Sequence, residues 1–440
     1  MTSSLRRDIV SVVKLQILVT AVGLITQIFL ARYLGPQQKG VLDLFLLIPT
    51  VLVSVIDLGL LSANTYLAGK KIVPTEILHS HSILWSLLAS FILLIAAFAF
   101  RESLQSLLGN SLGRFLILAI ALAGPTLYFS LWSSLMYGVD RVRSVYTFNA
   151  ITSILALVFY GVVAYTFGLN ISAFLYATAT VVILKAVAAL SIFRFDVPIR
   201  LSVDLSAVKT SLGYGVAIYL GLIVNTLHLR LDQFFVNSLK GPADLANYAL
   251  AVRMAEMLWL LDYAIINASI FRITSSSAEE ATHITQRMAR LVGSLVFVAS
   301  FIIALAAPFL IPLVFGIDFA PAAIPLMLLL PGTLAWSLSR VLSQFVAYQS
   351  GKPWYNMLAA TLGFMLNLVL IIVLIPLWGI RGAAISSTIS HIFNLALTIW
   401  IFRRLSKSKI LPTFIPQKED FVVLKEMTVQ YLRGRASTQE

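Results

Sequence analysis

The sequence predicts an all-α polytopic membrane protein with about twelve transmembrane helices. Of its 440 residues, 59% are hydrophobic and only 12% are charged, and the mean hydropathy is +0.92. A water-soluble core stops growing at domain size, whereas a chain dissolved in lipid is apolar on its outside as well. Runs of about 20 apolar residues, the length that crosses the hydrocarbon layer as a helix, recur along the chain.

Twelve such runs can be drawn along the chain. The predicted spans are 9–30, 41–69, 82–100, 115–138, 146–167, 171–193, 211–238, 244–272, 289–315, 321–350, 354–378 and 380–403. Between the first two lies the stretch LARYLGPQQKG. There Gly35 permits a tight turn, Pro36 cannot continue a helix, and Arg32 and Lys39 can reach lipid headgroups. We expect a hairpin at this point.

The net charge of +13 reflects the orientation of the chain in the membrane. Lys and Arg gather in the loops and tails of one side, as the positive-inside rule requires of the cytoplasmic side. An even number of spans then places both termini in the cytoplasm. Excess charge explained in this way gives no reason to expect a nucleic-acid partner, and it suits anionic membrane lipids. The absence of cysteine excludes disulfides and thiolate metal sites.

A weak internal repeat divides the chain. Gly35 and Pro36 recur as Gly241 and Pro242, 206 residues later, and Pro125 recurs as Pro331. After a five-residue slip, Gly168 answers Gly379. Because each copy holds six spans, both copies face the same way, which predicts a parallel repeat about an axis along the membrane normal. The predicted domains are an N-terminal six-helix bundle (1–195), a cytoplasmic linker (196–206), a C-terminal six-helix bundle (207–404) and a cytoplasmic tail (405–440).

Two prolines are predicted hinges. Pro125 and Pro331 each remove a backbone donor inside a span, beside Gly124 and Gly332, so their helices should bend under load.

Ionisable residues inside the spans are the candidate site residues, because a charge in lipid is costly unless it is paired, hydrated or near the interface. The set comprises Lys14, Lys185, Arg230, Arg253, Arg340, Asp43, Asp57, Asp232, Glu256 and Asp262. Arg253 and Glu256 share one helical face and can pair. Arg340 has no acidic residue within four positions, which favours a functional role.

Two stretches carry a resemblance to a known family. The segment RYLGPQQKGVLDLFLLIPTVLVSVIDLGLLSANTY, Arg32 to Tyr66, resembles the N-terminal signature of the Wzx-type polysaccharide biosynthesis flippases. Their superfamily also contains the MATE drug antiporters and the MurJ-type lipid II flippases. WGIRGAAIS, Trp378 to Ser386, is similar to a turn that precedes a late helix in these proteins. Beyond Arg404 no further span can be drawn, unlike in the lipid II branch.

The resemblance implies two bundles around a central cavity in a bacterial inner membrane, moving lipid-pyrophosphate-linked oligosaccharides, such as O-antigen repeat units, to the outer leaflet. A polysaccharide polymerase would then take up the product. The implied cavity needs cations for the pyrophosphate and amides for the sugars. Arg340, Arg253, Arg32, Lys14, Asn64 and Asn225 are the candidates, and Asp57, Asp232, Glu256 and Asp262 are candidates for coupling to H⁺ or Na⁺.

Other function classes have weaker support. A MATE-like exporter of small molecules belongs to the same superfamily and remains the alternative. A membrane glycosyltransferase or ligase would need catalytic groups on sizeable external loops, and the longest external loop, 101–114, holds a single acid, Glu102. No catalytic motif, metal-ligand spacing or nucleotide-binding loop occurs, so we expect neither enzyme activity nor a cofactor.

Overall fold

The computed structural model describes residues 3–108, 112–193 and 204–408, and every regular element in these ranges is helical. The elements are α1 (Ser3–Ile56), α2 (Leu60–Gly69), α3 (Thr75–Ala99), α4 (Arg101–Leu108), η1 (Gly113–Phe115), α5 (Leu116–Ala121), α6 (Ala123–Gly138), α7 (Val142–Phe167), α8 (Ile171–Phe193), α9 (Leu205–Lys240), α10 (Pro242–Met257), α11 (Trp259–Ser275), α12 (Ala278–Phe315), η2 (Ile317–Ala322), α13 (Ala323–Gln344), η3 (Phe345–Gln349) and α14 (Trp354–Ser406). Most of the predicted linker and tail lies outside the described residues.

The prediction of an all-α polytopic membrane protein is confirmed. Within the described ranges, nine helices are long and apolar enough to cross a bilayer, or ten with the bent α9. The 54 residues of α1 would extend about 81 Å, far more than one crossing requires. The nine include both halves of α14, which is divided at Gly379. If α1 is likewise divided at Gly35, and α10 with α11 counts as one broken crossing, a helix accounts for each of the twelve predicted spans.

Glycines end the helices where the sequence predicts turns. Gly35 interrupts α1 with φ 66° and ψ 172°, and Gly241 separates α9 from α10 with φ 92° and ψ 178°. This backbone region is essentially restricted to glycine. Gly168, at φ 59° and ψ −149°, and Gly379, at φ 57° and ψ −134°, form a second matched pair. Residues paired by the repeat therefore share their backbone conformation.

Three further breaks interrupt predicted spans. The second span stops at residues 57–59, where Leu58 and Gly59 have positive φ angles. The fourth is divided at Leu122 and the eighth at Leu258. The side chain of Asp57 caps the helix after the first break, as described below.

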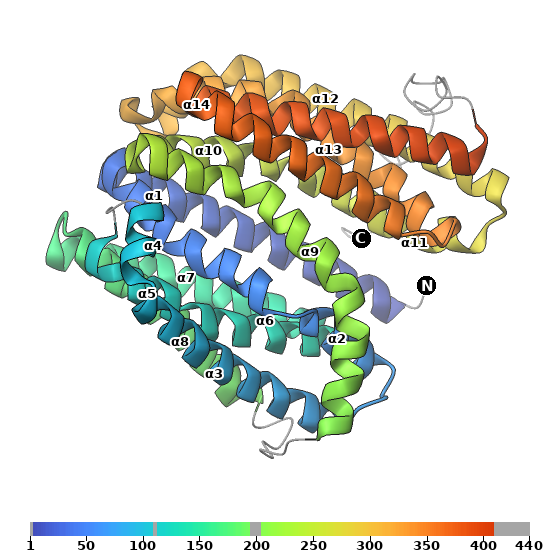
Figure 1. Cartoon of the computed structure of the whole chain (residues 1–440), viewed down its shortest axis with the longest axis horizontal. Helices are drawn as coiled ribbons and strands as arrows, with labels where there is room; N and C mark the ends of the chain where they lie inside the picture. The colour runs from blue at the N-terminus through green and yellow to red at the C-terminus, as the bar shows by residue number, and fades with distance from the viewer. Residues whose placement is uncertain (1–2, 109–111, 194–203, 409–440) are drawn as a thin grey trace, which may run out of the picture. The chain divides into compact units, whose positions relative to one another are not determined.

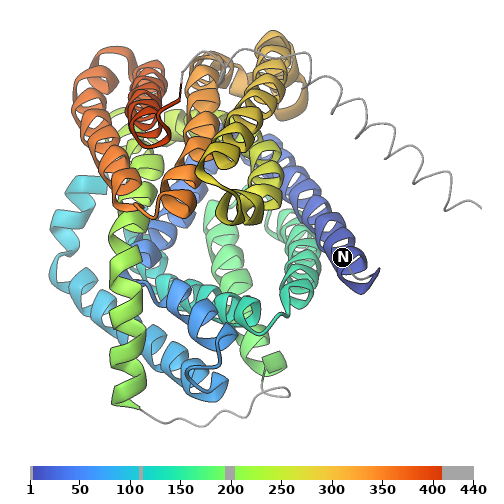
Figure 2. The ribbon, with the colours of Figure 1, turned by 90° about the vertical axis from the view of Figure 1, so that its right-hand side faces the viewer.

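The chain forms two compact units, Met1–Ala249 with Ile311–Ala320, and Leu250–Leu310 with Pro321–Glu440. The predicted division at 196–206 stays a prediction. In the first unit, α6 packs against α2, α3 and α8, and α1 packs against α7 (Figure 1). The long α9 lies along α1 and α2 and also contacts α4, which is drawn in cyan in Figure 2. A cluster containing Leu67, Trp132 and Val145 forms the core of this unit.

In the second unit, α13 lies along α14 and also contacts α11 (Figure 1). Val292 of α12, Val341 of α13 and Phe402 of α14 meet in its main apolar cluster. The polar side chains of α11, α13 and α14 that are described below lie in the same unit.

Candidate transport site

A buried ion pair joins α11 to α13 in the second unit. Nη1 of Arg340 lies 2.9 Å from Oδ1 of Asp262; the Asp262 side chain is fully enclosed and that of Arg340 is 29% exposed. The guanidinium also lies 5.8 Å from the ring centroid of Tyr263. A charge inside the membrane is tolerated when an opposite charge meets it. The sequence predicts both residues as site candidates and misses their pairing, because the contact is between helices.

Both helices that carry this pair are irregular beside it. Just before Asp262, the amide of Leu258 donates to Ala255 O at 3.2 Å and that of Leu261 donates to Leu258 O at 3.1 Å. These bonds connect residues three apart, as in a 3₁₀-helix. After Arg340, residues Phe345–Gln349 form a π-helix. Such local departures from α-helical winding are frequent at functional positions and at hinges.

A polar stripe runs along the second half of α14. Ser386, Ser390, Asn394 and Thr398 recur every four residues, and all four are buried. Ser339 of α13 donates a hydrogen bond of 2.6 Å to Oδ1 of Asn394. Residues four apart lie on one helical face. The four-residue spacing in the sequence therefore indicates this stripe, although the site residues predicted from the sequence do not include it.

Aromatic side chains stand beside the stripe. The ring centroids of Trp336 and His391 are 4.7 Å apart, and Trp259 of α11 lies 6.2 Å from Trp336. The Trp336 and His391 rings and the polar stripe are buried together between α11, α13 and α14, where the hydroxyls and the amide are hydrogen-bonded within the protein.

The predicted cavity cation Arg32 is engaged at a helix end. Its Nε donates to the carbonyl of Val314 at 2.7 Å, and its Nη2 donates to the carbonyl of Leu313. These carbonyls belong to the last turn of α12, where helical acceptors lack partners and a positive charge is favourable. Lys39, expected at the headgroups, is buried against Asp43.

The remaining cation candidates lie at the surfaces of their helices. Lys14 of α1 and Arg253 of α10 are exposed. Glu256, one turn after Arg253, is half-buried, as is Asn225 of α9.

Asp57 is placed as a helix cap. Its carboxylate accepts the backbone amides of Leu61 at 2.9 Å and of Gly59 at 3.2 Å, which are orphan donors at the start of α2. A carboxylate at this position also favours the positive end of the helix dipole. The cap compensates the break at 57–59.

Two other candidates take part in buried hydrogen bonds. Asp232 of α9 accepts a 2.5 Å hydrogen bond from the hydroxyl of Tyr248 on α10. Asn64 of α2 donates to Ser82 Oγ at 3.0 Å, and it lines an apolar cavity of the first unit. Polar bonds of this kind join neighbouring helices within a membrane.

The two prolines occupy different helical positions. Pro125 lies in the first turn of α6, directly after the break at Leu122, where its missing donor costs little. Pro331 lies within α13. There the hydroxyl of Thr388 donates to Leu328 O at 2.6 Å, one turn before the proline. A side-chain donor at this point compensates for the disturbed helix ladder.

Helices that are apolar outside and carry an ion pair and a polar stripe inside define a multi-pass membrane protein. The match to the family described as polysaccharide biosynthesis protein covers residues 29–324, and the chain belongs to that family. Its relative in Haloferax volcanii, the "probable low-salt glycan biosynthesis flippase Agl15", is 23% identical over 373 residues, or 84% of this chain and 77% of the relative.

Solved structures show the same fold. An inward-facing MATE multidrug transporter of the MOP superfamily superposes with a TM-score of 0.74 at 15% identity, covering 89% of this chain and 96% of the transporter. The lipid II flippase MurJ in an inward closed conformation gives 0.71 at 16% identity, covering 96% and 92% of the two chains. The fold expected from the sequence resemblance is thereby confirmed.

Proposed function

We propose that this protein is a flippase for lipid-pyrophosphate-linked oligosaccharides, the repeat units of a surface polysaccharide such as O-antigen, which it moves from the inner to the outer leaflet by alternating access. It acts in the bacterial inner membrane, with both termini in the cytoplasm, and delivers its product to a polysaccharide polymerase. The family and the glycan flippase of Haloferax volcanii support this proposal. No chemical step is required of the protein.

The Asp262–Arg340 ion pair carries the proposal. Arg340 is held from one side by a fully enclosed carboxylate while its side chain stays 29% exposed. A guanidinium has five N–H donors in a planar fork that fits phosphate oxygens. The pair therefore fixes an anion-binding group in the membrane without leaving its charge uncompensated when no substrate is bound.

Substrate binding in this scheme is an exchange of partners. As the pyrophosphate approaches Arg340, its oxygens replace those of Asp262, whose buried carboxylate then lacks a countercharge. The uptake of one proton neutralises that carboxylate, and release of the substrate returns the proton as the ion pair re-forms. Burial of an unpaired charge costs several kcal/mol, so the exchange couples substrate and H⁺ stoichiometrically.

We propose that the aromatic and polar side chains near Arg340 contribute to binding of the sugar portion once α13 and α14 separate. In the present structure Trp336 and His391 pack against each other, and Ser339 is hydrogen-bonded to Asn394. Sugars combine apolar ring faces with hydroxyls, so both kinds of group contribute to their binding.

The direct test uses proteoliposomes that contain the purified protein and a fluorescent lipid-pyrophosphate oligosaccharide in the inner leaflet. A membrane-impermeant glycosidase added outside reports arrival at the outer leaflet. We expect the glycolipid to become accessible to the glycosidase at a protein-dependent rate. Because a proton travels with the substrate in this scheme, the rate should increase when the vesicle interior is more acidic than the outside. A rate equal to that of protein-free vesicles would contradict the proposal.

The alternative is a MATE-like antiporter of small molecules. A buried acid beside the aromatic rings of Trp259 and Tyr263 would also suit an organic cation, and this arrangement is what favours the second candidate. Export of a fluorescent cation in the same vesicles, without movement of the glycolipid, would establish it. Transfer of sugar between lipid carriers would instead indicate a glycosyltransferase or ligase.

A further inference from the structure

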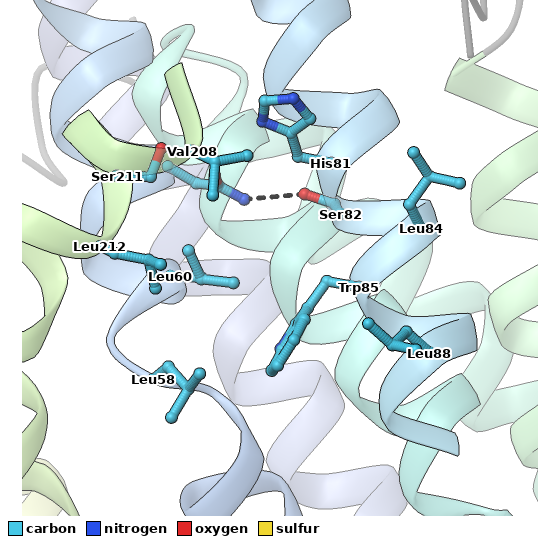
Figure 3. Close-up of a pocket in the computed structure, with 11 residues that line it drawn as sticks. Leu58, Leu60, His81, Ser82, Leu84, Trp85, Leu88, Val208, Ser211 and Leu212 are labelled. Carbon is cyan, nitrogen blue, oxygen red and sulfur yellow. Dashed lines mark hydrogen bonds between the residues drawn. The ribbon is translucent and has the colours of Figure 1, made fainter. Parts of the chain in front are cut away.

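Ser337 of α13 carries a buried hydroxyl that has no hydrogen-bond partner in the described part of the chain. The residue is fully buried, and its Oγ is unsatisfied. Ser82 of the first unit shows the usual arrangement of a buried hydroxyl: it donates to Leu78 O at 2.8 Å and accepts the side-chain amide of Asn64 at 3.0 Å, the bond drawn in Figure 3. Buried polar groups are rarely left without a partner, so the hydroxyl of Ser337 calls for an explanation.

Two contacts between α11 and α13 place Ser337 beside the ion pair. The rings of Trp259 and Trp336 lie 6.2 Å apart, and about one turn further along both helices Asp262 meets Arg340. Ser337 lies between these contacts, three residues before Arg340 and therefore on the same helical face. Its hydroxyl is accordingly a neighbour of the Asp262 carboxylate.

The exchange of partners described above creates a new hydrogen-bond donor at this point. When Arg340 binds the pyrophosphate, Asp262 takes up one proton from the aqueous side, so one O–H bond forms on its carboxylate and no other covalent bond changes. A protonated carboxyl group donates a hydrogen bond. Because the Asp262 side chain is fully enclosed, this donor needs an acceptor within the protein.

The chemistry of the neighbouring groups selects Ser337 as the acceptor. The guanidinium of Arg340 and the indole of Trp259 carry donors only, whereas a hydroxyl oxygen has two lone pairs. Both carboxylate oxygens of Asp262 also lack a hydrogen bond of regular geometry in the described ranges. An unsatisfied hydroxyl therefore lies next to the one group whose protonation would satisfy it.

The charge of Arg340 controls this proton. Among the charged side chains of the described residues, Arg340 acts most strongly on Asp262. The other titratable side chains on elements around α11 include Glu256 of α10, Arg290 of α12, Tyr348 of η3 and His391 of α14. A proton on Asp262 is thus disfavoured while the ion pair is intact and favoured once Arg340 has turned to the substrate.

We propose that Ser337 is a positioning residue for proton coupling, whose Oγ accepts the hydrogen bond of protonated Asp262 while Arg340 holds the substrate. This role rests on the flippase mechanism proposed above. In the ion-paired state the hydroxyl stays unsatisfied, which raises the free energy of that state. The two states are thereby brought closer in free energy, and the proton can be bound and released in each cycle.

Infrared spectroscopy of the purified full chain tests the hydrogen bond without any transport assay. Arg340→Met leaves Asp262 without a cation, so its carboxyl group should be protonated, and its C=O band is the one that disappears when Asp262→Asn is added. We expect Ser337→Ala, added to Arg340→Met, to move this band to higher frequency, as loss of a hydrogen bond does. Ser337→Thr should leave the band in place. An unmoved band in Ser337→Ala would assign the acceptor to another group and overturn the proposal.

A second measurement keeps Arg340 in place and uses the glycosidase assay with equal pH on both sides of the vesicles. Ser337→Ala should require about fivefold more protons for half-maximal flipping, the usual worth of one hydrogen bond. Its melting temperature should not fall, because the hydroxyl removed was unsatisfied. Ser337→Thr should keep the wild-type pH profile. An unchanged profile in Ser337→Ala would contradict the assigned role.

The matched control is Ser300→Ala. It removes another buried, unsatisfied hydroxyl, on α12, which carries neither member of the ion pair, and it should leave the pH profile unchanged. The two measurements also separate this inference from the proposed function. If the infrared band moves and the wild-type protein flips no glycolipid, the flippase proposal fails and the hydrogen bond between Ser337 and Asp262 stands.

Discussion

At the scale of single residues, the structure divides the candidate charges into two kinds. Asp57 and Arg32 are engaged by backbone groups at helix ends, whereas Asp262 and Arg340 are engaged by each other. A backbone cap contributes mainly to stability. An ion pair between helices can exchange partners, so it is the better candidate for transport.

Arg340→Ala should abolish surface polysaccharide in cells and should also destabilise the protein. Removal of one partner leaves the enclosed Asp262 carboxylate uncompensated, at a cost of about 3–5 kcal/mol. The double variant Asp262→Asn with Arg340→Gln should recover most of the protein level without export. Arg404→Ala, at an exposed arginine near the end of α14, serves as control. Wild-type export by the double variant would disprove the role of the pair.

Arg32→Ala should act through stability alone. Loss of a cation from the last turn of α12 should cost about 1 kcal/mol, seen as a lower melting temperature in detergent. Export per folded molecule should stay at the wild-type value. A loss of export with an unchanged melting temperature would instead support the predicted role of Arg32 as a substrate-binding cation in the transport cavity.

Asp57 allows its two roles to be separated. Asn caps a helix about as well as Asp, whereas Ala costs about 1 kcal/mol. We therefore expect Asp57→Asn to keep both stability and transport, and Asp57→Ala to lose stability. If Asp57→Asn abolishes proton-driven flipping and leaves the melting temperature unchanged, Asp57 is an ion-coupling residue.

At the scale of elements, the difference between the two prolines makes α13 the sharper hinge test. Pro331→Ala restores a backbone donor inside α13 and should stabilise that helix, because proline in a helix interior costs about 3 kcal/mol. Flipping in vesicles should become slower while the melting temperature rises. Pro125→Ala, in a first turn, should change both less. Equal flipping rates for the wild-type protein and both variants would indicate that Pro331 contributes to packing and does not act as a hinge.

Several elements could be predicted from the sequence because their causes are local. The breaks at Gly35 and Gly379 follow from glycine at turns between apolar runs, and the spans follow from length and hydropathy. The break at Leu258 has no such local signal. The Asp262–Arg340 pair and the cap on the end of α12 join distant segments, so spacing along one helix cannot reveal them.

At the scale of the whole molecule, the paired glycines support the proposed parallel repeat. The prediction is that Gly35→Ala and Gly241→Ala cause similar losses of stability, about 1–3 kcal/mol each. An added Cβ meets nothing within 4 Å at either position, so backbone strain is the sole cause. Gly161→Ala, in helix α7 with equally open space, should be neutral or stabilising. A penalty at only one of the first two positions would weaken the repeat proposal.

The matched glycines also bear on ancestry. A conformation almost closed to L-residues, kept at positions 206 residues apart, is what a gene duplication followed by fusion would leave behind. Before fusion, a six-helix ancestor pairing with itself would have carried every ionisable group twice. At the same offset, Asp262 and Arg340 correspond to Ile56 and Ser134, neither of which ionises. If the two halves arose in this way, fusion would have released the two copies from identity, so that a charge pair could arise in one of them alone.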